Sequence, residues 1–175
     1  MRICVFGTGG VGGYFGGLLA RSGADVTFIA RGEHLRALRA RGLTLRTVQD
    51  RLTIPVKATD EPRAAGPVDL VLFCVKSYDT ESAGGVLPDL LAPEGVVLSL
   101  QNGIDNEEKL EAILGKGRVL GGAAYIWSTI TAPGGLSVLL VQYVSLREGY
   151  AEWRPEVMRG AAVGDRRAGM LITSA

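Results

Sequence analysis

Short runs of apolar residues recur along the chain and are separated by glycine, proline and charged residues. A run of about four to eight apolar residues between turn residues is typical of a parallel strand that is buried on both faces. The pattern predicts strands over residues 3–6, 25–30, 70–75, 96–100, 119–125 and 127–131.

Apolar residues spaced three and four positions apart predict helices between these strands. The clearest helix covers residues 11–22, where Val11, Phe15, Leu18 and Leu19 share one stripe and Gly23 follows at the C-terminal end. Further helices are predicted at 34–41, at 80–91 (weakened by Gly84, Gly85 and Pro88) and at 106–114 (with Asp105 as its cap), and a hairpin at 43–47 and 52–56. Because strands and helices alternate, the predicted fold class is α/β, with a Rossmann-type, doubly wound and mainly parallel sheet.

The pattern changes after Pro133 and Gly134. We therefore divide the chain into a Rossmann domain over residues 1–134 and an atypical tail over residues 135–175. Residues 136–144 form one more apolar, strand-like run, which we expect to be unpaired and exposed. Residues 145–175 show no clear periodicity, and no structure is assigned to them.

Composition excludes several classes of protein. Hydrophobic residues make up 47% of the chain, enough for a packed core, and the net charge of +1 indicates no attraction to nucleic acid or to a membrane surface. We expect no membrane span, because no apolar run is long enough, and no signal peptide, because the first strand begins at once. Cys4 and Cys74 match no metal or redox spacing, so we expect buried thiols in a reducing cytoplasm and no metal site.

A glycine-rich turn directly follows the first predicted strand and opens the first predicted helix. Its sequence G-T-G-G-V-G has the spacing G-x-G-x-x-G, with Gly7 at the tight turn, Gly9 near a pyrophosphate and Gly12 at the helix–strand contact. Backbone N–H groups at such a helix start bind phosphate without any side chain. The alternative is a purely structural turn, since glycine-rich stretches are common in loops. The cofactor-binding residues predicted from the turn are Gly7, Thr8, Gly9, Gly10, Val11 and Gly12.

The end of the second strand favours NADPH over NADH. Folds that prefer NAD place Asp or Glu there to bind the ribose 2′-hydroxyl, whereas this chain continues with Ala30 and Arg31. A guanidinium group can hold a 2′-phosphate through paired, charge-assisted hydrogen bonds. The alternative is that Arg31 is a solvated loop charge.

Polar residues also follow two later strands, at the edge where ligands lie in such sheets. Lys76 ends one strand and Asn102 ends the next. A lysine there can bind a ribose hydroxyl or a carboxylate, and an asparagine amide can orient a nicotinamide or a substrate oxygen, although both could be ordinary strand ends. Gln101 is expected to pack or to face solvent, and His34, the one histidine, to lie on the surface of its helix.

Five segments taken together, in this order, resemble the N-terminal domain of the ketopantoate reductase (2-dehydropantoate 2-reductase) family. They are G-T-G-G-V-G-G-Y-F-G-G, F-I-A-R-G, C-V-K-S-Y-D-T, Q-N-G-I-D-N-E-E and V-L-G-G-A-A-Y-I, and the resemblance runs from Met1 to about Gly134. It implies an NADPH-dependent oxidoreductase that delivers hydride to the C2 ketone of ketopantoate, forming pantoate for pantothenate and coenzyme A.

The resemblance also implies roles for single residues. The glycine turn would hold the pyrophosphate, Arg31 the 2′-phosphate and Lys76 the cofactor ribose. Asn102 would touch cofactor and substrate near the reacting carbon, which makes it the catalytic candidate. Trp127 aligns with a further cofactor contact, but it is larger than the residue expected there.

The chain departs from the family pattern after the sequence T-A-P-G. The family's second, helical domain supplies a proton-donating lysine, and no lysine follows Lys116 in this chain. We expect a frameshift or a natural truncation, with a shortened family member carrying a private tail as the alternative. The chain alone would then be inactive.

Two classes of function therefore remain open. The chain is either the cofactor domain of a reductase, acting on ketopantoate or on another branched 2-oxo acid, or an NADP(H)-binding module without turnover. The expected partner is a small 2-oxo acid rather than nucleic acid or a membrane, and homo-oligomerisation is left open.

Overall fold

The computed structural model describes residues 1–48, 50–146 and 172–173. Most of the segment 145–175, for which no element was predicted, lies outside these residues. At the centre are parallel strands in the order β7-β6-β1-β2-β5, with β8 beside β7. Their bounds are β1 (Arg2–Phe6), β2 (Asp25–Ile29), β5 (Lys57–Thr59), β6 (Val68–Phe73), β7 (Leu91–Ser99) and β8 (Val119–Ala132).

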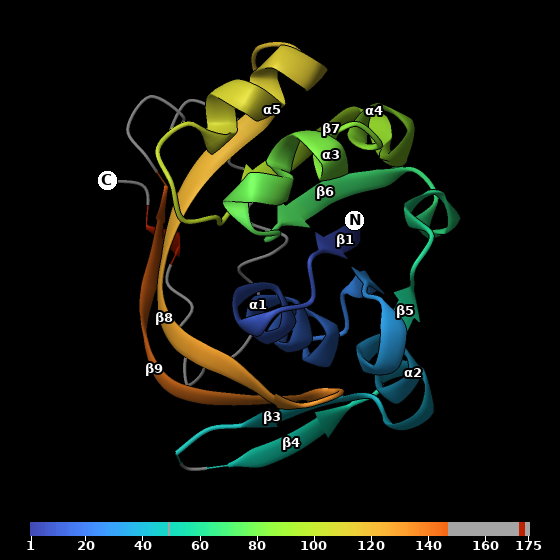
Figure 1. The fold of residues 1–175 in the computed structure, drawn as a ribbon, viewed down its shortest axis with the longest axis vertical. Helices are drawn as coiled ribbons and strands as arrows, with labels where there is room; N and C mark the ends of the chain where they lie inside the picture. The colour runs from blue at the N-terminus through green and yellow to red at the C-terminus, as the bar shows by residue number, and fades with distance from the viewer. Residues whose placement is uncertain (49, 147–171, 174–175) are drawn as a thin grey trace.

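Helices cover both faces of this parallel sheet, which confirms the α/β, doubly wound fold (Figure 1). Apolar residues of α1 (Gly10–Arg21) and α2 (Gly32–Arg41) pack in one core cluster. Residues of α4 (Leu87–Leu90) and α5 (Asn106–Leu114) pack in the other, with α3 (Thr80–Gly84) beside α5. Two 3-10 turns, η1 (Pro62–Ala65) and η2 (Ser77–Asp79), join these elements to the strands.

Two helix predictions need correction. The helix predicted over residues 80–91 is broken, because α3 ends at Gly84 and α4 begins only at Leu87. This break agrees with the low helix propensity of Gly84 and Gly85. Asp105 does occupy the cap position of α5, but its side chain makes no cap hydrogen bond there and instead pairs with Lys109 at 2.7 Å.

The strands after residue 119 form a long antiparallel ribbon. The two strands predicted at 119–125 and 127–131 are one strand, β8, which first pairs with β7 and then with β9 (Gly135–Leu146). The expectation of an unpaired strand at 136–144 is wrong, since β9 pairs with β8 on one side and with β3 (Leu43–Arg46) on the other. β3 pairs in turn with β4 (Arg51–Ile54), as the predicted hairpin requires. A short strand, β10 (Ile172–Thr173), also pairs with β9.

The turn between β8 and β9 explains this pairing. Gly134 has φ +76° and reverses the chain, and its carbonyl accepts a hydrogen bond of 2.8 Å from the N–H of Thr44 in β3. Leu136 and Val138 consequently enter the core around α1. The sheet therefore continues past residue 134, while the origin of the tail beyond β9 remains a hypothesis.

Helix α1 lies between the parallel sheet and the ribbon (Figure 1). A Cβ atom at Gly16 would contact the side chains of Val5 and Phe28 in the parallel sheet. A Cβ atom at Gly13 would contact Leu136 in β9, and one at Gly17 would lie 2.9 Å from Leu43 in β3. Glycines on two sides of one helix thus let its backbone approach both layers.

The two cysteines lie against the parallel sheet as apolar residues would. Cys4 is buried and Cys74 partly buried, and burial raises the pKa of both thiols to about 12. Both are therefore protonated at neutral pH, as unreactive structural cysteines are. Within the described residues, no helix combines the length and apolar composition needed to cross a membrane.

The contacts of α1 predict an unusual effect of a helix-favouring substitution. Gly16→Ala should lower the free energy of unfolding by about 1–3 kcal/mol, because the new methyl group overpacks against Val5 and Phe28. Gly85→Ala is the matched control, since a Cβ there meets only ordinary contacts at 3.8 Å and φ is −58°. That substitution should leave stability unchanged or raise it by about 0.4–1 kcal/mol. Urea unfolding measures both, and equal effects would contradict the described packing.

Candidate functional site

The glycine turn joins β1 to α1 at the C-terminal edge of the parallel sheet. Gly7 has φ +99°, and a Cβ atom there would lie 2.8 Å from the backbone carbon of Cys74 and 2.9 Å from the backbone nitrogen of Val75. A Cβ at Gly12 would contact the carbonyl oxygen of Gly7. Both positions therefore require glycine for backbone reasons alone.

Gly9 differs from its neighbours in the turn. It is the N-cap of α1, with φ −87°, and a Cβ atom there would have no other atom within 4 Å. Space is therefore open above the backbone at the one position where the sequence predicts a pyrophosphate. The fold does not need glycine at Gly9, but a closely approaching ligand would.

The first turn of α1, directly after Gly9, has backbone N–H groups without a partner inside the helix. The N–H of Gly13 bonds to the carbonyl of Gly9 at 2.8 Å, so the amides of Gly10, Val11 and Gly12 precede the first helical hydrogen bond. No acidic side chain lies in the first turn, which leaves the partial positive charge of the helix start uncompensated by the helix itself. This arrangement suits a phosphate.

A hydrogen bond ties the turn to the end of β2. The buried hydroxyl of Thr8 donates to the carbonyl oxygen of Ile29 at 2.9 Å. Arg31 follows two residues later as the N-cap of α2, where its side chain is exposed. The turn and Arg31 are therefore held in one fixed relation by the pairing of β1 and β2.

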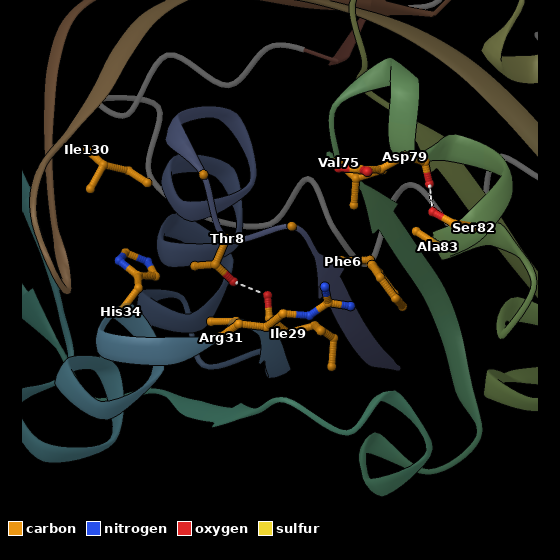
Figure 2. Close-up of a pocket in the computed structure, with 13 residues that line it drawn as sticks. Phe6, Thr8, Ile29, Arg31, His34, Val75, Asp79, Ser82, Ala83 and Ile130 are labelled. Atoms are coloured by element: carbon orange, nitrogen blue, oxygen red, sulfur yellow. Dashed lines mark hydrogen bonds between the residues drawn. The ribbon is translucent and has the colours of Figure 1, made fainter.

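A cavity of about 530 Å³ opens between these elements. In Figure 2 the side chain of Arg31 extends along one side, with its guanidinium group between Thr8 and Phe6 in this view. Asp79, Ser82 and Ala83, from η2 and α3, form the opposite wall, where the Ser82 hydroxyl donates to the Asp79 carbonyl at 3.1 Å. The lining residues are Phe6, Gly7, Thr8, Gly9, Ile29, Ala30, Arg31, His34, Val75, Asp79, Ser82, Ala83 and Ile130.

Lys76 and Asn102 do not line this cavity, although they lie at the same edge of the sheet. In the parallel pairing of β6 with β7, Phe73 lies opposite Ser99. Lys76 comes three residues after Phe73, and Asn102 comes three residues after Ser99. Both side chains are exposed. Trp127 is 68% exposed and does not line the cavity either, whereas Ile130, on the same strand, does.

His34 lies where the sequence did not place it, whereas Gln101 takes one of its two expected positions. The predicted surface position of His34 is wrong, because its side chain is partly buried and lines the cavity. Its Nδ1 accepts a hydrogen bond of 3.1 Å from the N–H of Gly134, which joins α2 to the β8–β9 turn. Gln101 packs in the interior, as one of the two expected alternatives, with its amide fully engaged in hydrogen bonds.

The cavity residues that were not predicted from the sequence come mainly from the opposite wall of the cavity and from the β8–β9 ribbon. Asp79, Ser82 and Ala83 follow Lys76 within one short stretch, and that proximity was the available signal. The sequence held no such signal for Ile130, because the position of this residue depends on the curvature of β8 (Figure 1). No cluster of metal-binding side chains was found in the part of the chain that the structure describes.

Comparison with known proteins matches this arrangement to one family. A family model described as "Ketopantoate reductase PanE/ApbA" matches residues 3–146. The chain belongs to this family. The resemblance read from the five sequence segments is thereby confirmed.

Relatives in the ketopantoate reductase family are longer than this chain. A 2-dehydropantoate 2-reductase of Pyrococcus horikoshii is 41% identical over 134 residues, which cover 77% of this chain and 43% of that protein. One from Archaeoglobus fulgidus is 34% identical over 168 residues, covering 93% of this chain and 54% of its own length. The crystal structure of the 2-dehydropantoate 2-reductase from Geobacter metallireducens superimposes with a TM-score of 0.89 at 32% identity, covering 100% of this chain and 58% of that one. The chain thus spans about half the length of these relatives.

The glycine turn generates a prediction that separates ligand binding from folding. Gly9→Val should weaken the binding of NADPH and NADH together by about tenfold or more, because a branched side chain would fill the open space above the turn. Its thermal stability should change little. Gly7→Val is the comparison variant and should be strongly destabilised, given the positive φ and the Cys74 backbone contact. Calorimetric titration of a folded Gly9→Val protein with unchanged NADPH affinity would contradict a phosphate-binding role.

His34 generates a prediction for the pH dependence of stability. Burial lowers the pKa of the imidazole below its ordinary value of 6.5, and a contact with the backbone of Thr8 offsets this only in part. Because the folded pKa lies below the unfolded one, the contribution of His34 is fully present above pH 6.5 and is lost as the pH falls toward the folded pKa. The free energy of unfolding should therefore rise as the pH is raised from the folded pKa of His34 through 6.5.

The single histidine makes this test direct. NMR titration of a tag-free chain should show one imidazole with a pKa below 6.5. His34→Gln should remove the part of the stability slope that belongs to this group, since glutamine does not titrate. An imidazole pKa at or above 6.5 would show that the ring does not occupy the described environment.

Proposed function

We propose that this chain binds NADPH and supplies the cofactor domain for the reduction of 2-dehydropantoate to pantoate. The observation that carries the proposal is the open glycine turn at the start of α1, held beside Arg31 at the end of β2. The family match and the names of the relatives support the reaction. Since the chain spans about half of those relatives, the reaction of the whole protein is part of the proposal.

The residues present fit a phosphorylated dinucleotide. The space over Gly9 accepts a pyrophosphate, and the first turn of α1 carries no acidic side chain that would repel it. Among the described residues, Arg31 takes part in none of the observed ion pairs, so its guanidinium group is available to a 2′-phosphate. An aspartate or glutamate in this place would repel that phosphate.

The cavity accommodates only part of such a cofactor. The cavity is surrounded by the glycine turn, by Arg31 and by the opposite wall of Asp79, Ser82 and Ala83. We therefore assign it to the adenosine 2′-phosphate half of the cofactor. Lys76 and Asn102 lie outside the cavity on the same sheet edge, and we assign them to the nicotinamide half. Lys76 would bind the ribose, and Asn102 would orient the nicotinamide and the 2-oxo group of the substrate.

The chemistry then divides between cofactor and chain. NADPH, when bound, supplies the hydride. The residues of this chain bind the phosphates and orient the ring through backbone amides, Arg31, Lys76 and Asn102. A proton must also reach the ketone oxygen, and a positioned acid contributes about 10²–10⁴-fold to such a step. We assign Lys76 to the ribose, and no lysine follows Lys116 in this sequence, so we propose that the chain alone is not an efficient reductase.

Two other functions share the same cofactor site. The chain could serve as an NADP(H)-binding module without turnover, or belong to a reductase of another branched 2-oxo acid. NADPH binding without turnover on any 2-oxo acid would support the first. A reductase of another branched 2-oxo acid would need the same contacts at Gly9, Arg31 and Asn102. A comparison of substrates therefore separates it from the main proposal.

The choice of cofactor is tested at Arg31. The unmutated chain should bind NADPH at least about tenfold more tightly than NADH, because a charge-assisted hydrogen bond contributes about 1.5–3 kcal/mol. Arg31→Ala should remove most of this difference and leave NADH affinity nearly unchanged. Arg36→Ala is the matched control, since Arg36 lies on the same helix and pairs with Glu33 at 3.3 Å. Equal affinities for both cofactors in the unmutated chain would rule out the assignment.

Turnover is tested with the same purified, mass-verified chain. Oxidation of NADPH with saturating ketopantoate should be negligible even though NADPH binds. Parallel assays with other branched 2-oxo acids address the alternative substrate. Robust turnover that disappears in Asn102→Ala would show that the chain is an enzyme by itself and that its proton donor lies elsewhere in this sequence.

A further inference from the structure

A continuous series of side-chain hydrogen bonds runs through the interior between β6, β7, α3 and α5. The hydroxyl of Ser99 donates to Oε1 of Gln101 at 3.4 Å, and Nε2 of Gln101 donates to the hydroxyl of Thr80 at 2.8 Å. That hydroxyl donates in turn to Oδ1 of Asn106 at 2.9 Å. The exposed fractions are 0% for Ser99, 8% for Gln101, 1% for Thr80 and 0% for Asn106. We call these four residues the Gln101 network.

The network has two backbone end points, and both belong to the candidate site. Nε2 of Gln101 also donates to the carbonyl oxygen of Val75 at 3.0 Å, directly before Lys76. Nδ2 of Asn106 donates to the carbonyl oxygen of Asn102 itself at 3.0 Å. The loops that carry Lys76 and Asn102 are therefore joined through one buried set of side chains, although Lys76 and Asn102 are themselves exposed.

Energetics argue that Gln101, Thr80 and Asn106 act as a unit, because they form the path between the Val75 and Asn102 carbonyls, whereas Ser99 lies outside that path. Every hydrogen bond in the series runs in one direction, from Ser99 to Asn102, so each donor polarises the next. Removing one of these three side chains leaves buried donors or acceptors unpaired on both sides, which is costly in the interior. A shift of the Lys76 loop is consequently opposed by bonds that also hold the Asn102 loop.

We propose that Thr80, Gln101 and Asn106 are positioning residues that set the spacing between Lys76 and Asn102 for the nicotinamide-ribose end of the cofactor. This inference rests on the proposed function. None of the three needs to touch the ligand, since they act through the carbonyls of Val75 and Asn102. Val75 and α3 also line the cavity of the adenosine 2′-phosphate half, but among the described residues no hydrogen bond joins these three side chains to Gly9 or Arg31, where we place the phosphate contacts.

Because the cofactor has two halves, a ligand that contains only one of them can distinguish a positioning role of these residues from a merely structural role. Adenosine 2′,5′-bisphosphate carries the adenosine and the 2′-phosphate but has no nicotinamide ribose. Thr80→Val keeps the branched shape and removes the hydroxyl, and we expect it to weaken NADPH binding about tenfold while changing adenosine 2′,5′-bisphosphate binding by less than about twofold. Thr80→Ser keeps a hydroxyl and should restore NADPH binding. Arg31→Ala, by contrast, should weaken both ligands.

Two further variants complete the experiment. Ser99→Ala removes only the longest bond, which reaches neither loop, and should leave both affinities unchanged. If Thr80→Val does not fold, Gln101→Met tests the same connection by removing both donors of Nε2. Hydrogen exchange on the ligand-free chain provides a second readout. In the Thr80→Val and Gln101→Met variants, segments 76–79 and 102–105 should lose protection together, while the amides of α1 should stay protected.

The outcomes separate this inference from the cofactor proposal. If the unmutated chain binds neither ligand, the proposed function fails and the inference fails with it. If the unmutated chain binds both but the folded Thr80→Val or Gln101→Met variant binds NADPH normally, the cofactor proposal stands and the positioning role is wrong. Equal losses for both ligands would show a general structural role and would also overturn it.

Discussion

The close approach of α1 to the layers on either side of it is the constraint on which the rest of the structure depends. A helix normally keeps its neighbours at the distance of a side chain, but here a Cβ at Gly12 or Gly16 would collide with the parallel sheet, and one at Gly13 or Gly17 with the ribbon side. Glycine in a helix costs about 1 kcal/mol relative to alanine, so the gain must come from packing. The same closeness brings the start of α1 to the edge of β1, where Gly9 remains open.

The resulting site depends more on backbone than on side chains. The glycine turn offers amides, the hydroxyl of Thr8 holds the turn to β2, and the Gln101 network holds the carbonyls of Val75 and Asn102. The side chains of Arg31, Lys76 and Asn102 are exposed; Arg31 and Lys76 precede α2 and η2, and Asn102 follows the end of β7 by three residues. Rigid secondary structure therefore sets their positions, and the exposed side chains retain freedom to meet a ligand.

Much of this could be predicted from local sequence, for identifiable reasons. Strands β1 and β6 and residues 96–98 of β7 are nearly all apolar because both faces are covered, and the glycine turn has a spacing that few other structures require. The three-residue strand β5 was missed because it is too short to show a period. The partners of β9 were missed because pairing with β3 joins distant parts of the chain.

The position of His34 depends on the same distant contact. Its helix is strongly basic, which indicated a solvated surface, yet the β8–β9 turn packs against it and gives its Nδ1 a donor at Gly134. Gln101 and Thr80 could not be connected from sequence either, since their hydrogen bond joins two strand ends through α3. The errors therefore fall where tertiary contacts override local pattern, mainly around the ribbon and the far wall of the cavity.

The pairing of β3 with β9 has a consequence for the order in which the chain can fold. Thr44 in β3 lies opposite Gly135 in β9. The β3–β4 hairpin therefore cannot join the sheet through β9 until almost all of the described chain has been synthesised. During that interval the β1–α1–β2 unit can form from local contacts, but one side of α1 has no cover, because Leu136 and Val138 arrive late. Such non-local pairing slows folding. A nascent chain of this protein therefore exposes one side of its glycine-rich helix on the ribosome until β9 emerges.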